Sequence, residues 1–102
     1  MDYRVVWTPG ADSNLEGIAE FIQRDSPYYA SVVVSKIRSE ARRLRKYPFR
    51  NRVVPEINDE SVREVFVYEY RLIYEILDDT VIVMMIIHAS RELLNVHNPR
   101  RN

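Results

Sequence analysis

The chain has 102 residues, of which 46% are hydrophobic and 29% are charged, as is usual for one small folded domain. It contains no cysteine, which excludes a disulfide framework, a thiolate metal site and a cysteine nucleophile, and which fits a reducing cytoplasm. No apolar run approaches the roughly 20 residues that a membrane-spanning helix needs, and the first residues do not resemble a signal peptide. We therefore expect a cytoplasmic protein that has no membrane partner.

The formal net charge is zero, but the charges are segregated along the chain. Between Lys36 and Arg52 the only acid is Glu40, and the cations of this basic ridge are Lys36, Arg38, Arg42, Arg43, Arg45, Lys46, Arg50 and Arg52. A local positive surface of this kind attracts an acidic peptide or a nucleic acid even in a neutral protein. The alternative interpretation is a solvated helix face followed by a loop.

The first predicted elements are a short strand and an amphipathic helix. Residues Tyr3 to Trp7 are β-branched and aromatic, which is typical of a strand. Thr8 and Pro9 then provide an N-cap and a proline at the first helical position. The apolar residues that follow have the spacing of one helical face, and they are Ala11, Leu15, Ile18, Ala19 and Ile22.

A second helix is predicted from about Tyr28 to Lys46. Asp25-Ser26-Pro27 separates it from the first helix, because the residue before a proline is disfavoured in helical geometry. Pro48 closes the helix. Its expected inward positions are Ala30, Val33, Val34, Ile37, Ala41 and Leu44. The short connection predicts that the two helices pack antiparallel as a hairpin.

Three strands are predicted in the second half of the chain: Val62 to Val67, Tyr70 to Leu77 and Thr80 to His88. In the last of them both alternate sets of side chains are apolar, which indicates a strand near the middle of the sheet that is covered on both faces. The predicted fold class is α+β, with an N-terminal strand and a two-helix antiparallel hairpin packed on a mostly antiparallel four-stranded sheet. Because the helices can cover one face only, we expect the other face to offer an apolar surface to a partner.

Arginines lie near the ends of these strands. Arg71 opens the second strand of the meander and Arg91 follows the third, so antiparallel pairing can bring both side chains to one spot. Arg63 can join them from the neighbouring strand. Guanidinium groups gathered in this way bind a phosphate or a carboxylate through paired N–H groups.

Ion pairing within the chain is the alternative interpretation of the same arginines. Arg71 would then pair with Glu56 or Glu75, and Arg91 with Glu92. Both interpretations are compatible with the sequence.

The two histidines have no clear role from the sequence. His88 ends the last strand, where a histidine is more often a hydrogen-bonded structural residue than a base. His97 lies near enough to Arg91 in the chain to reach the same patch, or it can face solvent. With no cysteine and no carboxylate cluster of metal-site spacing, the sequence predicts no metal site. It also lacks a phosphate loop, a dinucleotide fingerprint and a nucleophile elbow, and we expect no cofactor.

In their order along the chain, several short motifs resemble the RelE/ParE toxin superfamily of bacterial type II toxin–antitoxin modules. These motifs are Val54-Pro55-Glu56, Arg63-Glu64, Tyr70-Arg71-Leu72-Ile73-Tyr74 and His88-Ala89-Ser90-Arg91-Glu92-Leu93. The resemblance implies a toxin domain over residues 1–94, followed by a polar tail at residues 95–102. The Val-Pro-Glu and His-x-x-Arg elements look more like the ParE branch.

The two branches differ in their targets. RelE-type toxins cut messenger RNA on the ribosome with a cluster of basic residues, and the catalytic candidates would then be Arg63, Arg71, Arg91 and His97. The strand at residues 62–67 lacks the lysines that RelE-type enzymes often carry, and arginines alone bind charge without acting as an acid or a base near neutral pH. ParE-type toxins act on DNA gyrase without a nuclease centre. The pattern favours a ParE-like gyrase inhibitor over an endoribonuclease, and it leaves open whether the chain is an enzyme.

The resemblance also implies a cognate antitoxin and a toxin–antitoxin hetero-oligomer. We expect antitoxin carboxylates to contact Arg42, Arg43 and Arg45. The residues expected to bind the target or an anion are Arg63, Arg71, His88 and Arg91. The alternative from a different class of protein is a nontoxic module that binds a peptide on the free face of the sheet.

Overall fold

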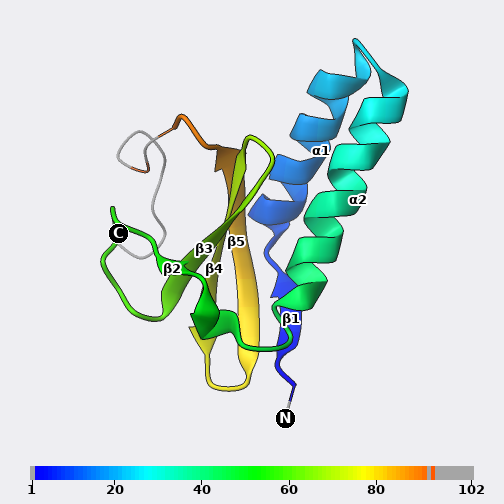
Figure 1. Cartoon of the computed structure of the whole chain (residues 1–102). Helices are drawn as coiled ribbons and strands as arrows, with labels where there is room; N and C mark the ends of the chain where they lie inside the picture. Colours follow the sequence, from blue (N-terminus) through cyan, green and yellow to red (C-terminus); the bar gives the residue numbers. More distant parts are fainter. Residues whose placement is uncertain (1, 92, 94–102) are drawn as a thin grey trace.

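A computed structural model describes residues 2–91 and Leu93. The elements in chain order are β1 (Arg4–Trp7), α1 (Pro9–Gln23), α2 (Pro27–Arg43), the 3-10 helix η1 (Pro48–Arg50), β2 (Arg52–Val53), β3 (Val62–Val67), β4 (Tyr70–Leu77) and β5 (Thr80–His88). The two long helices form an antiparallel hairpin against one face of the sheet (Figure 1). The predicted α+β class is therefore confirmed. The predicted tail and His97 lie outside the described residues.

Both long helices begin where the sequence predicts, because their N-caps are in place. Thr8 Oγ1 accepts a hydrogen bond from the Ala11 amide at 3.0 Å, and Ser26 Oγ accepts one from the Tyr29 amide at 3.1 Å. α2 ends at Arg43 instead of Lys46, since the chain turns into a left-handed conformation at Tyr47 with φ 54°. No helix in the described part of the chain is long and apolar enough to cross a membrane.

The sheet has five strands in the order β1-β5-β4-β3-β2. β1 pairs in parallel with β5, and the other neighbours are antiparallel. The expected four strands are present, and β2 adds a fifth at the edge. With only Arg52 and Val53, β2 is too short to produce an alternating pattern that sequence reasoning can detect.

β5 lies between β1 and β4 and is covered on both faces, as predicted. A register shift pairs Tyr74 with Val83 but the preceding Ile73 with Met85, so that β5 carries one extra residue at this point. One extra residue exchanges the faces to which the following side chains point. Val83 accordingly packs with the helices, whereas Met85 packs on the opposite side, which we call the far face.

The far face is covered by the chain itself. The loop after β2 folds back over the sheet and places Val54 and Ile57 on it, and Leu93 packs beside them. The resulting apolar cluster consists of Val54, Ile57, Val62, Ile73, Met85, Ile87 and Leu93. The prediction that this face is open is therefore wrong across the cluster. Helix and strand periodicity gives no signal that an irregular loop will serve as a cover.

Candidate functional site

A buried ion-pair network lies on the far face, where β3 and β4 pair. Its centre is Arg71, whose exposed fraction is 4%, beside Glu64, whose exposed fraction is 1%. Arg71 Nε donates a hydrogen bond to Glu64 Oε1 at 2.7 Å, and Arg71 Nη2 lies 2.7 Å from the same oxygen. The register of the hairpin pairs Arg71 with Phe66, which makes Glu64 the diagonal neighbour of Arg71 on the same face.

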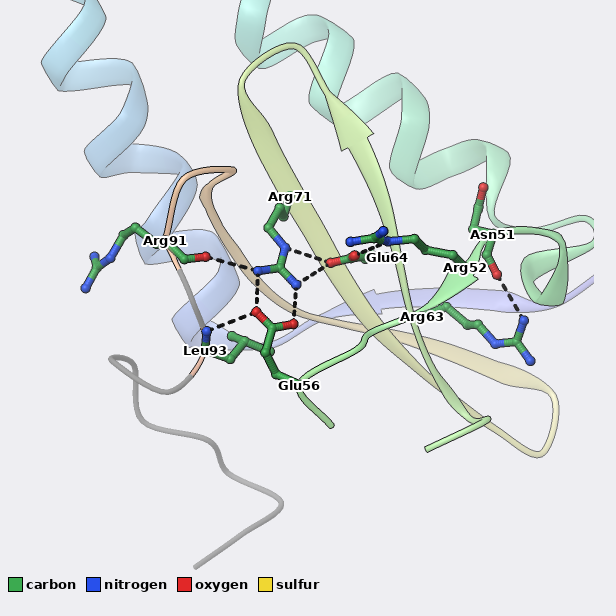
Figure 2. Close-up of polar contacts among 8 residues, drawn as sticks. All are labelled: Asn51, Arg52, Glu56, Arg63, Glu64, Arg71, Arg91 and Leu93. Atoms are coloured by element: carbon green, nitrogen blue, oxygen red, sulfur yellow. Dashed lines mark hydrogen bonds and ion pairs between the residues drawn. The ribbon is translucent and has the colours of Figure 1, made fainter. Parts of the chain in front are cut away.

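Glu56 completes the network from the loop after β2. Its two carboxylate oxygens accept hydrogen bonds from Arg71 Nη1 and Nη2, each at 2.8 Å. Arg71 Nη1 also donates to the Arg91 carbonyl at 3.0 Å, and the Leu93 amide donates to Glu56 Oε2 at 3.3 Å (Figure 2). The Arg71 guanidinium therefore donates four hydrogen bonds inside the protein, and Nη2 makes a further ion-pair contact with Glu64.

The charges of the network balance. Arg52 is the second cation, since its Nε donates to Glu64 Oε2 at 2.5 Å while its guanidinium lies over the Phe66 ring. The hydrogen bonds from Arg71 lower the pKa of Glu56 to about 2. In turn, the hydrogen bonds to Glu56, followed by those to Glu64, raise the pKa of Arg71. Two cations and two carboxylates thus stabilise each other, with Arg71 and Glu64 buried and the Arg52 side chain 57% exposed.

This geometry agrees with the ion-pair interpretation of Arg71. Glu56 is one of the two partners considered from the sequence, and Glu64 takes the place considered for Glu75. An incoming phosphate would have to displace protein oxygens from every guanidinium nitrogen of Arg71. The residue expected to bind an external anion is instead held within the fold.

Arg63 points to the opposite side of the sheet from Arg71. It is paired with Tyr74, whose ring lies in the helix-side core. Arg63 Nη1 donates to the carbonyl oxygens of Phe49 at 2.8 Å and Asn51 at 2.9 Å. Arg63 therefore anchors the segment between α2 and β2, and it does not join Arg71 in an anion site.

Arg91 contributes its backbone carbonyl to the network. Its guanidinium points away from Arg71 (Figure 2), and the residue is exposed. Among the described catalytic candidates of the RelE-type interpretation, Arg63, Arg71 and Arg91 do not converge on one spot. Of these three side chains, Arg91 is the one free to meet a partner in solution.

His88 is exposed and is held by local hydrogen bonds. Its Nδ1 accepts a hydrogen bond from the Ser90 amide at 3.1 Å and lies 2.8 Å from Ser90 Oγ. Its ring meets the edge of Tyr70, with 5.7 Å between the ring centroids. Because Nδ1 is occupied as an acceptor, these contacts favour the structural interpretation of His88.

The expected antitoxin contacts lie at the C-terminal end of α2. Arg42 and Arg43 are in its last turn, and Arg45 follows the helix. Arg43 is partly neutralised by Glu40 at 3.2 Å, and Arg45 by Asp2 at 3.3 Å. All three arginines are exposed, so the basic ridge is accessible there. Among the described residues, no group of three metal-ligating side chains is arranged to hold a metal ion.

Glu64 is a key residue whose role sequence reasoning missed. It is a buried carboxylate that shares one face of β3 with the apolar residues Val62 and Phe66. A two-residue turn after Val67 fixes the hairpin register and sets Glu64 diagonally opposite Arg71. The two charges, considered together with that register, are a detectable signal of a buried ion pair.

Comparison with known protein families gives a match over most of the chain. The family described as "ParE toxin of type II toxin-antitoxin system, parDE" matches residues 5–93. No curated protein matches the chain.

Solved structures with a similar fold include the following two toxin–antitoxin systems. The chromosomal ParDE system from P. aeruginosa has a TM-score of 0.72 and 15% sequence identity, over 86% of this chain and 97% of that chain. The RelBE2 toxin–antitoxin complex from Mycobacterium tuberculosis has a TM-score of 0.58 and 22% identity, over 86% and 99% of the two chains. At these identities the structures show the shared fold alone. The family match spans almost the whole chain, and the chain therefore belongs to the ParE toxin family of type II toxin–antitoxin systems.

Proposed function

We propose that this toxin inhibits DNA gyrase and has no nuclease activity of its own. The observation that carries the proposal is the complete pairing of Arg71. In a RelE-type nuclease, the arginine of this strand has to meet the charge that develops on a phosphate. Here that arginine is buried, and all three of its guanidinium nitrogens donate hydrogen bonds to protein oxygens. An inhibitor that acts by binding gyrase has no need of such a group.

The dispersal of the other arginines supports the same proposal. Arg63 is bonded to the segment before β2, and the guanidinium of Arg91 points away from Arg71. Cleavage near neutral pH also requires an acid or a base with a suitable pKa, which an arginine does not supply. We infer that Arg91 contacts the target as an exposed cation.

We further propose that a cognate antitoxin neutralises this toxin in a hetero-oligomer in the cytoplasm, with antitoxin carboxylates on Arg42, Arg43 and Arg45. Both similar solved structures are described as toxin–antitoxin systems. The double substitution Arg42→Glu and Arg43→Glu should weaken co-elution of toxin and antitoxin at moderate salt. The control is Arg24→Glu, which reverses an exposed charge in the turn between α1 and α2.

Induction of the toxin in cells tests the choice of target. Inhibited gyrase should produce DNA damage signalling and altered supercoiling while messenger RNA stays intact. A ribosomal nuclease would instead stop translation within minutes and leave codon-phased cuts. If induction leaves growth unchanged, the toxin assignment fails and the peptide-binding alternative gains support.

A further inference from the structure

Exposed aromatic rings and cations form a surface between α2 and β2. We call it the Tyr47 edge, and it consists of Lys46, Tyr47, Phe49 and Arg50. The exposed fraction is 70% for Tyr47 and 48% for Phe49. The guanidinium carbon of Arg50 lies 5.3 Å from the centroid of the Tyr47 ring, and that of Arg63 lies 5.2 Å from the centroid of the Phe49 ring. One face of each ring is therefore covered within the chain, and the other face can meet a partner. Large apolar side chains gathered at a polar surface indicate a contact site.

No ion pair among the described residues neutralises the cations of this edge. No carboxylate in the described part of the chain pairs with Lys46, Arg50 or the nearby Arg42. The neighbouring acids Glu40 and Asp2 are paired with other cations of the basic ridge. The edge therefore carries a net positive charge in a protein whose total charge is zero.

The surface is hollowed on either side of the Tyr47 ring. Lys46, Tyr47 and Arg50 line three adjoining depressions with volumes of about 600, 430 and 160 Å³. Phe49 and Pro48 add apolar surface to the largest of them. Asp2 also lines the largest depression and Glu40 the smallest, and each of these acids is paired with a cation of the basic ridge. The Tyr47 edge thus borders three hollows that share Lys46, Tyr47 and Arg50.

Buried anchors hold the backbone of the edge. The Tyr74 hydroxyl donates to the Pro48 carbonyl at 2.6 Å and accepts from Asn51 Nδ2 at 3.0 Å. Arg63 Nη1 donates to the carbonyl oxygens of Phe49 and Asn51, the two neighbours of Arg50 in the chain. Tyr47 itself has φ 54° and ψ 49°, a conformation that bulky residues rarely adopt. These buried hydrogen bonds hold the backbone that presents the exposed Tyr47 ring.

We propose that the Tyr47 edge binds single-stranded nucleic acid, with bases stacked on Tyr47 and Phe49 and phosphates held by Lys46, Arg50 and Arg42. Stacking on aromatic side chains accepts any base but requires that the base be unpaired, which favours a single strand over a duplex. A polyacid without rings, such as polyglutamate, would meet the cations and leave the two aromatic rings unused. This proposal does not depend on gyrase being the target, because it concerns direct binding of a nucleic-acid strand to the toxin.

The test is binding of a fluorescently labelled oligothymidylate and an oligouridylate, each of about 12 nucleotides, to the purified full chain at low salt. Tyr47→Leu should weaken binding roughly 10-fold, since it removes one stacking face. Arg50→Gln should weaken binding and reduce the slope of log affinity against log salt by about 0.7, the share of one phosphate on a single strand.

Matched variants separate this site from general charge. Tyr28→Leu removes a tyrosine that is 79% exposed at the other end of α2, and Arg24→Gln removes an exposed arginine there. Both should bind the strands as the parent chain does. Tyr47→Phe, which keeps the ring, should also bind normally, and circular dichroism checks that each variant is folded.

Three results would overturn the proposal. The first is that neither strand binds the parent chain at low salt. The second is that Tyr47→Leu binds no more weakly than Tyr28→Leu, which would reduce the edge to a charged surface for acidic partners such as polyglutamate. The third is that thymidine monophosphate competes as well as the strand, which would make the ligand a free nucleotide.

Discussion

Arg71 and Glu56 form a two-pronged ion pair in which both Nη atoms donate to the carboxylate oxygens at 2.8 Å. The same two side chains hold the Arg91 carbonyl and the Leu93 amide. The pair therefore fastens two irregular segments to the sheet: the loop after β2 and the stretch after β5. The pair stabilises the fold, so removing either side chain should lower the free energy of unfolding.

Replacing Arg71 with methionine should destabilise the protein by about 3–5 kcal/mol, because Glu64 would keep a buried charge without its main partner. The free energy of unfolding in urea measures this loss. Arg91→Met, which leaves the backbone carbonyl in place and alters an exposed side chain, should change it by less than about 0.5 kcal/mol. An Arg71→Met variant as stable as the parent chain would restore Arg71 as a candidate ligand for an external anion.

Stability should depend on pH through Glu56, whose pKa is lowered from 4.5 to about 2 in the folded protein. A lowered pKa means that the carboxylate stabilises the fold above about pH 4.5 and loses this contribution as the pH falls through 2. The contribution is on the order of 3 kcal/mol at neutral pH. Glu56→Gln should therefore be less stable at pH 7, and its difference from the parent chain should shrink on acidification. Parallel pH curves for the two proteins would contradict this account.

Tyr74→Phe tests the anchor beneath the Tyr47 edge. The substitution leaves the buried ring in place but deprives the Pro48 carbonyl of its donor, which should cost roughly 1–3 kcal/mol. Thermal unfolding measures the loss, with Tyr28→Phe as an exposed control. Equal melting temperatures for both variants would mean that the hydroxyl does not stabilise the segment.

Arg91→Ala should abolish growth inhibition without unfolding the toxin. Its guanidinium is exposed and points away from the ion-pair network, so its loss removes a target contact and little stability. Growth after induction and the melting temperature should be measured on the same variant. Full toxicity of Arg91→Ala would remove Arg91 from the proposed target surface.

Much of the architecture could be predicted from local signals in the sequence. Thr8 and Ser26 mark the two helix starts, and both act as N-caps in the structure. The two-residue turns between the last three strands fix their antiparallel pairing. N-caps and tight turns depend on residues that are adjacent in the chain, so they can be recognised in the sequence.

The parts that could not be predicted depend on an irregular loop. Val54 and Ile57 cover the far face, and Glu56 reaches Arg71, only because the loop after β2 folds back across the sheet. No periodicity predicts that path. The anion-site hypothesis for Arg71 considers the strand ends, whereas the ion-pair alternative includes Glu56, and the path of the loop decides between them. Glu64 is a different case, because its position diagonally opposite Arg71 follows from the hairpin register and could be predicted from the sequence.

The most direct test is supercoiling by purified gyrase in the presence of the purified toxin. We predict that the parent chain and His97→Ala both inhibit supercoiling and that neither produces ribosome-phased cuts in a translation reaction. A histidine acting as a general acid or base contributes about 10² to 10⁴ in rate, so a nuclease that depends on His97 would lose its cleavage in this variant. Unimpaired supercoiling, together with phased cleavage that His97→Ala abolishes, would contradict the account and make this toxin a ribosome-dependent endoribonuclease.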